Sequence, residues 1–166
     1  MPLCKAGCAV EKQSAEVANA RLLIVDDIDD NRAILMRVFQ RRGFAVTAAI
    51  SGEEALQRLF NDPFDIIVLD WMMPDMDGLQ VLKHIRTQFT KEQLPVVMIT
   101  ARVAVDDVKE AMAAGANGYV TKPINITRAA DCVIGVLTKG YANVVRHGWS
   151  SDPSPTFDLM HEQRST

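Results

Sequence analysis

Short apolar runs alternate with amphipathic segments along most of this chain. The runs 22–25, 66–69 and 96–99 are uniformly apolar and are bounded by polar residues, which is typical of strands buried on both faces of a parallel sheet. The runs 44–49 and 118–120 predict two more strands. A threonine inside 44–49 makes that strand less apolar, which favours the edge of the sheet.

The segments between these strands have the spacing of amphipathic helices. Residues 29–31, Asp-Asp-Asn, offer a side-chain cap for the first helix, and Gly43 is placed to end it. Ser51 and Glu54 stand three apart, which is a capping-box signature for the second helix. The predicted helices span 30–42, 52–60, 79–87, 103–114 and 126–137, and the buried stripe of the second comprises Ala55, Leu56, Leu59 and Phe60.

A strand followed by a helix, repeated five times with short connections, predicts an α/β fold. Right-handed crossovers then place helices on both faces of a doubly wound, five-stranded parallel sheet. The size suits the flavodoxin-like strand order 2-1-3-4-5. We expect a domain over residues 21–138, preceded by a flexible leader over 1–20 and followed by a flexible tail over 139–166.

The composition suits one globular domain, with 48% hydrophobic and 23% charged residues. A net charge of −3 gives no basic field for nucleic acid, and the apolar runs are too short to span a membrane. No apolar segment of a secretory signal follows Lys5. The sparse cysteines indicate a reducing cytoplasm: Cys4 and Cys8 are interpreted as leader thiols rather than half a metal site, and Cys132 as a core residue.

Polar residues whose side chains can take part in binding or catalysis follow four of the predicted strands. They are Asp26 and Asp27, Asp70, Thr100 and Lys122. The carboxyl ends of parallel strands meet at one edge of the sheet, where open α/β sheets place their chemistry. Three adjacent carboxylates repel one another, and Mg²⁺, which prefers oxygen ligands, resolves that repulsion. A lysine and a hydroxyl beside them suit a phosphoryl group, so the set describes an aspartate that accepts one.

Each of these residues has a plainer interpretation when taken alone. Asp26 and Asp27 are ordinary loop acids or helix caps, Thr100 is an ordinary cap, and a lysine before a proline is a common loop pair. Their joint occurrence at the ends of separate strands favours the functional interpretation.

Five motifs together resemble those of the receiver domain of two-component response regulators. They are Asp26-Asp27, the segment Leu69-Asp70-Trp71-Met72-Met73-Pro74-Asp75-Met76-Asp77-Gly78, Thr100-Ala101, Tyr119 and Lys122-Pro123. The resemblance covers roughly residues 21–138. No effector module is evident beside this region, which suggests the single-domain type.

The resemblance implies a role for each of these positions. Asp70 is the phosphoacceptor, and Mg²⁺ is bound by Asp27, by Asp70 and by the backbone carbonyl of Met72, with Asp26 assisting through water. Lys122 contacts the phosphoryl group, Thr100 is the switch hydroxyl, and Tyr119 is the aromatic switch that follows it. The Lys122–Pro123 peptide bond is expected to be cis. The apolar Met72 cannot orient water, so moderate to slow autodephosphorylation is expected.

The resemblance also implies the partners. A sensor histidine kinase or a histidine phosphotransfer protein supplies the phosphoryl group, and a downstream target protein binds a face near Val103, Val105, Lys109, Met112 and Tyr119. The protein is a switch rather than an enzyme, and is a monomer or a phosphorylation-dependent dimer.

Two other function classes remain open from the residues. A Mg²⁺-dependent phosphohydrolase also forms an aspartyl phosphate, but commonly has a second acid two residues after the nucleophile, where this chain has Met72. A receiver-like binding module that does not switch is disfavoured by the complete set of acids.

Overall fold

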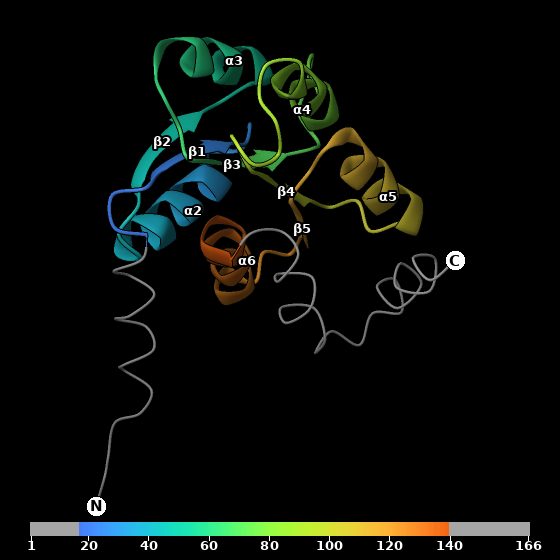
Figure 1. The fold of residues 1–166 in the computed structure, drawn as a ribbon. Coiled ribbons are helices and arrows are strands. Elements are labelled where there is room, and N and C mark those ends of the chain that lie inside the picture. The colour runs from blue at the N-terminus through green and yellow to red at the C-terminus, as the bar shows by residue number, and fades with distance from the viewer. Residues whose placement is uncertain (1–16, 140–166) are drawn as a thin grey trace, which may run out of the picture.

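Five parallel strands form one sheet in the order β2-β1-β3-β4-β5, which confirms the predicted topology. The computed structural model describes residues 17–139. Figure 1 shows the sheet with helices on both faces. The strands are β1 (Arg21–Val25), β2 (Ala45–Ala49), β3 (Ile66–Asp70), β4 (Val96–Thr100) and β5 (Gly118–Thr121).

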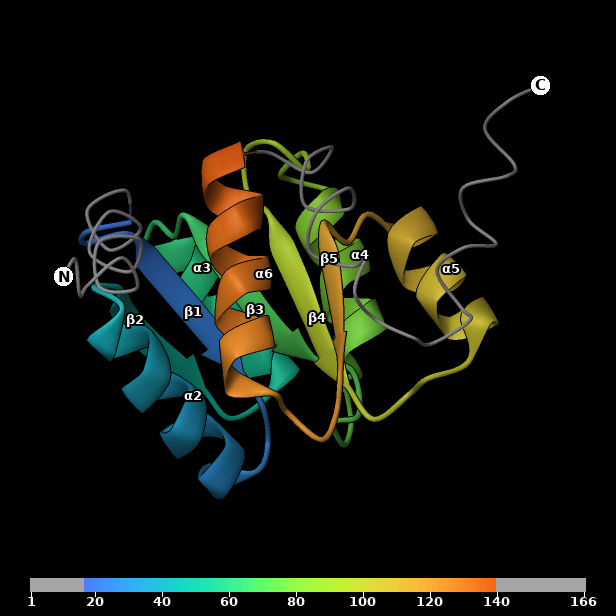
Figure 2. The ribbon, with the colours of Figure 1, turned by 90° about the horizontal axis from the view of Figure 1, so that it is seen from below.

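The helices lie in two groups, one on each face of the sheet (Figures 1 and 2). They are α2 (Asp29–Arg41), α3 (Gly52–Asn61), α4 (Gly78–Arg86), α5 (Val105–Ala114) and α6 (Ile126–Lys139). Alternate strand residues face opposite sides of a sheet. In β1, Leu23 and Val25 therefore pack with α3, α4 and α5, whereas Leu22 and Ile24 pack with α2 and α6.

The register of the strands brings their last residues together. Val25 pairs with Leu69, so the residues that follow each of them, Asp26 and Asp70, lie side by side. Asp70 in turn pairs with Ile99, one position before the end of β4. Because the strands are parallel, these ends share one edge of the sheet.

Three local predictions were wrong. Phe60 is 89% exposed and does not belong to the buried stripe of α3. The helix α5 begins at Val105, so the exposed Val103 lies in the preceding connection. The N-cap of α2 is Ile28, which makes no side-chain cap hydrogen bond. The acids at 29 and 30 lie inside the first helical turn, where the positive end of the helix dipole favours them.

The other predicted helix ends are largely confirmed. Ser51 caps α3 by accepting a hydrogen bond from the backbone N–H of Glu54. The carboxylate of Glu54 accepts a hydrogen bond from the backbone N–H of Ile50 and not from that of Ser51, so the second bond of the capping box involves the residue before the N-cap. Gly43 follows α2 with φ 94°, a conformation that favours glycine.

The first described residues correct the predicted leader. Val17 is buried and packs in the same core as α2 and α6, and the backbone N–H of Asn19 donates to the carbonyl of Gly43. The rest of the predicted leader, with Cys4 and Cys8, and the predicted tail beyond residue 139 lie outside the described residues. Cys132 is buried, as predicted. Of the helices within residues 17–139, none combines the length and apolarity needed to cross a bilayer.

Candidate functional site

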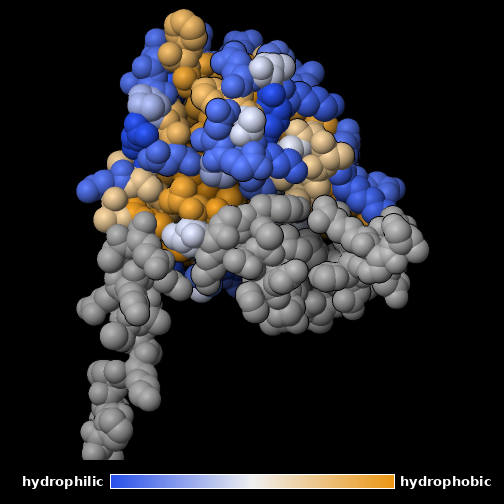
Figure 3. Space-filling view, in the orientation of Figure 1, coloured by the Kyte–Doolittle hydropathy of each residue, from blue (hydrophilic) through white to orange (hydrophobic). Residues whose placement is uncertain are grey.

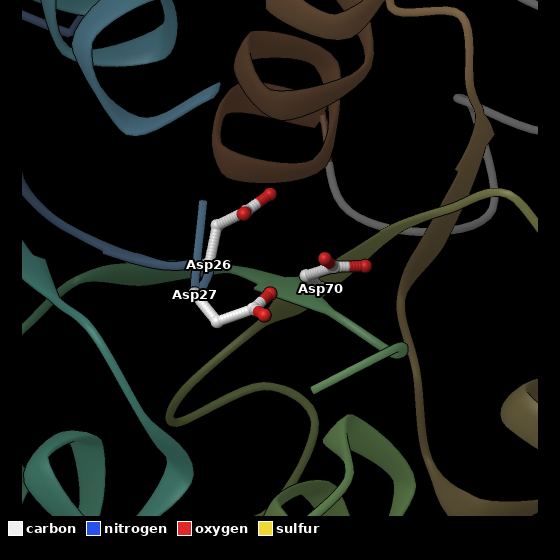
Figure 4. A group of neighbouring side chains, drawn as sticks. All are labelled: Asp26, Asp27 and Asp70. Carbon is white, nitrogen blue, oxygen red and sulfur yellow. The ribbon is translucent and has the colours of Figure 1, made fainter. Parts of the chain in front are cut away.

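Three carboxylates meet where β1 and β3 end (Figure 4). Asp26, Asp27 and Asp70 each offer one ligand oxygen, and these oxygens lie within 4.8 Å of one another. Asp26 and Asp70 are each 2% exposed. Such close carboxylates are stable only with compensation, because burial and mutual repulsion both disfavour their charged forms.

Protein donors largely satisfy Asp26. Its Oδ1 accepts a hydrogen bond from the backbone N–H of Ile28 at 2.8 Å. The side-chain amide of Asn31 donates to both of its oxygens, at 3.3 and 3.2 Å. Arg32 holds the backbone instead, donating to the carbonyl of Asp26 at 2.6 Å and to the carboxylate of Asp29. Asp26 is therefore fixed in place before any ligand arrives.

Asp27 differs from its neighbour. Its Oδ1 is buried and has no hydrogen-bond partner, and no other buried side-chain oxygen or nitrogen in the described part of the chain shares this property. A buried acceptor without a partner is costly. A hard divalent cation with oxygen ligands would satisfy it, so this donor set fits Mg²⁺. The position of the Met72 backbone carbonyl as a further ligand stays a prediction.

Lys122 supplies the positive charge of the cluster. Its Nζ donates to Oδ2 of Asp70 at 3.0 Å and to Oδ2 of Asp26 at 3.2 Å. Burial by itself lowers the pKa of Lys122, but the hydrogen bond and charge of Asp70, with those of Asp26, outweigh burial and raise it. Lys122 is therefore an ammonium. Its peptide bond to Pro123 is cis, as the resemblance implied.

The pKa of Asp70 lies above that of an ordinary carboxyl. Burial is the main cause; the hydrogen bond and charge of Lys122 act against it, and the charge of Asp26 adds to it. The backbone N–H of Met72 also donates to Oδ1 of Asp70, at 3.2 Å. A cation at this cluster would favour the carboxylate form, which is the form that can act as a nucleophile.

The connection from β3 to α4 packs tightly against Asp70. The backbone N–H of Gly78 donates to the carbonyl of Trp71 at 2.9 Å. A Cβ on Gly78 would lie 2.1 Å from the carbonyl oxygen of Asp70, so no other residue fits there. Asp77 and Gln80 then cap α4 reciprocally. The sequence contains this capping box, although the sequence analysis did not identify it.

Thr100 and Tyr119 are buried, and the hydrogen bonds of their side chains go to Arg102 and not to the carboxylates. The hydroxyl oxygen of Thr100 accepts a hydrogen bond from the backbone N–H of Arg102 at 3.1 Å. The hydroxyl of Tyr119 donates to the backbone carbonyl of Arg102 at 2.9 Å. Burial, helped by the charge of Asp107 and opposed by that of Arg102, raises the pKa of Tyr119 well above its ordinary value. The two predicted switch residues therefore meet at Arg102.

Sequence reasoning missed Asn31, Arg32 and Arg102. The position of Asn31, in the first turn of α2 and five residues after Asp26, is a usable signal, because it directs the side chain back towards the start of the helix. Arg102 carries no comparable signal, because its contacts come from separate strands and from α5.

Comparisons with known proteins agree with this geometry. The family model described as the response regulator receiver domain matches residues 22–133. The chemotaxis protein CheY of Pseudomonas aeruginosa is 42% identical over 104 residues, which cover 62% of this chain and 84% of that protein. Chemotaxis protein CheY-3 of Vibrio cholerae is 42% identical over 106 residues, covering 63% and 82%.

Solved structures give the same result. The receiver domain of the Francisella response regulator 1452 is 31% identical, with a TM-score of 0.66, and the match covers 73% of this chain and 98% of that one. Vibrio cholerae chemotaxis protein CheY4 is 32% identical, with a TM-score of 0.64, covering 70% and 99%.

Proposed function

Because this chain belongs to the response regulator receiver family, and so acts in phosphorelay signalling, we propose that Asp70 is its phosphoacceptor. The donor is a phosphohistidine of a sensor histidine kinase or of a histidine phosphotransfer protein. One observation carries this assignment: Asp70 is buried between the acids at the end of β1 and the ammonium of Lys122, 3.0 Å away.

Asp27, Asp70 and the carbonyl of Met72 are proposed to hold Mg²⁺, with Asp26 assisting through water. The unpartnered Oδ1 of Asp27 supports its direct role, and the saturated hydrogen bonding of Asp26 supports an indirect one. When bound, the cation supplies charge neutralisation at the acceptor and the phosphoryl oxygens.

In the proposed transfer, a carboxylate oxygen of Asp70 attacks phosphorus in line, and the bond from phosphorus to the donor nitrogen breaks. Lys122 neutralises charge on the phosphoryl oxygens. The hydroxyl of Thr100, buried at the end of the adjacent strand, donates to one of them. Positioning and electrostatics carry this chemistry, so no additional base is needed.

Family members of this kind are switches that accept a phosphoryl group. We propose that the phosphorylated form of Asp70 is hydrolysed at a moderate to slow rate. The side chain of Met72, two residues after Asp70, is 58% exposed and has no group that can orient an attacking water. An acid that would serve a phosphohydrolase is therefore lacking at this position.

The partner that delivers the phosphoryl group is proposed to be a protein. Asp70 is buried, so a macromolecular donor has to cover the connections around it. Of the seven large exposed hydrophobic residues in the described region, five lie in these connections or at the first residue of the next helix: Ile28, Ile50, Met72, Val103 and Ile126. Figure 3 shows one face on which hydrophobic residues reach the surface among hydrophilic ones. Exposed hydrophobic residues in several connections around a buried acceptor favour contact with a protein.

The target is proposed to bind near α5, β5 and α6, with the protein a cytoplasmic monomer or a phosphorylation-dependent dimer. Lys109 and Val103 are exposed in this region. Tyr119, which the sequence analysis placed on the same face, is buried and reaches the surface only if its ring moves.

Acetyl phosphate with Mg²⁺ tests the acceptor without any partner. Wild-type protein should gain the mass of one phosphoryl group, as an adduct that base removes. Asp70→Asn should gain none, whereas Asp75→Asn, which removes an exposed acid of the following loop, should label like the wild type. Labelling of Asp70→Asn at the wild-type rate would show that the acceptor is another residue.

A further inference from the structure

Arg102 joins four residues around the proposed switch. Its backbone N–H donates to Thr100 and its carbonyl accepts from Tyr119. Its guanidinium lies over the ring of Trp71, 4.6 Å from the centroid, and pairs with the carboxylate of Asp107 at 3.0 Å. One residue thus links the end of β4, the side chain from β5, the residue after the acceptor and the first turn of α5.

The backbone of Arg102 sets the orientation of the Thr100 hydroxyl. A hydroxyl has one proton to donate and two lone pairs that accept. The N–H of Arg102 occupies a lone pair at 3.1 Å. Within residues 17–139 the proton of this hydroxyl has no acceptor. It therefore remains available for an oxygen that arrives at Asp70.

The carbonyl of Arg102 holds Tyr119 in the interior. The ring of Tyr119 is 1% exposed and meets the ring of Trp71 edge to face, with centroids 6.5 Å apart. Its hydroxyl needs a partner at this depth, and the carbonyl of Arg102 provides one. If residues 101–104 shifted, the buried hydroxyl would lose that acceptor, which favours movement of the ring.

The side chain of Arg102 connects the segment 101–104 to Trp71 and to Asp107. It is 42% exposed, so its ion pair with Asp107 and its contact with Trp71 are each weak. A weak contact suits a two-state element, because a modest difference in free energy is enough to shift the populations of two states. A strong buried contact would lock the segment instead.

We propose that the side chain of Arg102 is a positioning residue that presets Thr100 and Tyr119 for the phosphorylated state. This inference rests on the proposed role of Asp70. If the preset arrangement is lost in part, the apparent affinity for a phosphoryl group falls in proportion to the fraction of molecules that remains competent. We expect the affinity for Mg²⁺ to be unchanged, because the hydrogen bonds and the ion pair of Arg102 go to Thr100, Tyr119 and Asp107 and not to the three acids.

The test compares Arg102→Gln and Asp107→Asn with the wild type in the full chain. Arg102→Lys keeps the charge but loses the planar group that stacks on the ring. Arg37→Gln removes an exposed arginine on α2 and is the matched control.

Calorimetry measures the affinity first for Mg²⁺ alone and then for beryllium fluoride, a phosphoryl mimic that binds a carboxylate. Trp149→Phe leaves Trp71 as the single tryptophan, so that its emission reports the stacking.

We expect Arg102→Gln to weaken beryllium fluoride binding roughly three- to tenfold with Mg²⁺ binding unchanged. Asp107→Asn should have a smaller effect, Arg102→Lys should lie between wild type and Arg102→Gln, and Arg37→Gln should match the wild type. Equal affinity of Arg102→Gln and wild type for the mimic would overturn the proposal, as would an equal loss of Mg²⁺ affinity. Failure of the wild type itself to bind the mimic would refute the proposed function and this inference with it.

Discussion

The ammonium of Lys122 lies between the carboxylates of Asp70 and Asp26, 3.0 Å from the first and 3.2 Å from the second. It compensates one of the three negative charges that meet at this edge of the sheet. Lys122 therefore stabilises the acid cluster and also repels an incoming cation, so its removal should separate cation binding from phosphoryl transfer.

Replacing Lys122 with methionine should tighten Mg²⁺ binding on the order of tenfold, because the acids lose their positive neighbour. Labelling by acetyl phosphate should slow at the same time, because no ammonium then faces the phosphoryl oxygens. Calorimetry and intact-mass measurements give the two quantities. Lys83→Met, on the exposed side of α4, should change neither. Parallel losses of both activities would mean that Lys122 only maintains the fold.

Replacing Asp70 with asparagine should change how stability depends on pH. Burial raises the pKa of Asp70 despite the opposing contact with Lys122. The folded state then holds the proton more tightly than the unfolded chain does, so stability falls as pH rises through the interval between the ordinary and the raised pKa. Asp70→Asn should lack this fall. Near neutral pH and with a chelator present, it should be more stable than the wild type, because the wild type then has to give up the proton that its folded state holds more tightly.

Urea unfolding over a pH series measures this difference. Asp75→Asn should keep the wild-type dependence, because its side chain is exposed outside the cluster. Parallel profiles for Asp70→Asn and wild type would contradict the raised pKa.

Adding a single methyl group at residue 78 should damage both fold and site. Gly78→Ala places a Cβ 2.1 Å from the backbone oxygen of Asp70, so the connection from β3 to α4 has to move. We expect a loss of roughly 3 kcal/mol in the free energy of unfolding and a weaker affinity for Mg²⁺. Asp77→Ala, which removes only the cap of α4, should cost about 1 kcal/mol with Mg²⁺ binding retained. Equal effects of the two variants would mean that the close approach is not important.

Arg86 should be essential for stability although it lies away from the acids. Its guanidinium donates to the carbonyls of Gly115 and Leu94, each at 2.9 Å, and to the side-chain oxygen of Asn117 at 3.0 Å. Burial lowers its pKa. Arg86→Met leaves these acceptors without their donor and should cost roughly 3 kcal/mol. Arg86→Lys should recover little, because a lysine lacks the planar fork. Urea unfolding measures both, with Arg37→Met as control. A cost of Arg86→Met no larger than that of the control would contradict this role.

A polar substitution in a connection beside the acid cluster should slow phosphoryl transfer from a protein donor without slowing transfer from a small-molecule donor. Ile50 is 58% exposed beside the cluster, whereas Phe60 is exposed at the far end of α3. Ile50→Ser should slow transfer from a phosphorylated histidine protein several-fold, because contact area is lost, and should leave labelling by acetyl phosphate unchanged. Phe60→Ser should leave both rates unchanged. If Phe60→Ser alone slows protein transfer, the donor binds along α3 instead.

The sequence was sufficient where local patterns and chain direction decide the outcome. The apolar periods gave the type and order of the elements, and parallel strands necessarily bring Asp26, Asp70 and Lys122 to one edge. Local patterns failed for Phe60, because helical spacing predicts a face but does not show how far the neighbouring elements extend over it. They failed also for the N-terminus of α2, where several residues were equally able to cap.

By itself, then, the sequence determined the architecture and the residues that end the strands, because these follow from periodicity and from the parallel direction of the strands. Only the tertiary structure distinguished Asp26, which protein donors satisfy, from Asp27, whose buried oxygen is left without one. Only the tertiary structure, likewise, placed Arg102 against Trp71 and Asp107. These contacts depend on strand register and loop paths, which join residues that no local pattern relates.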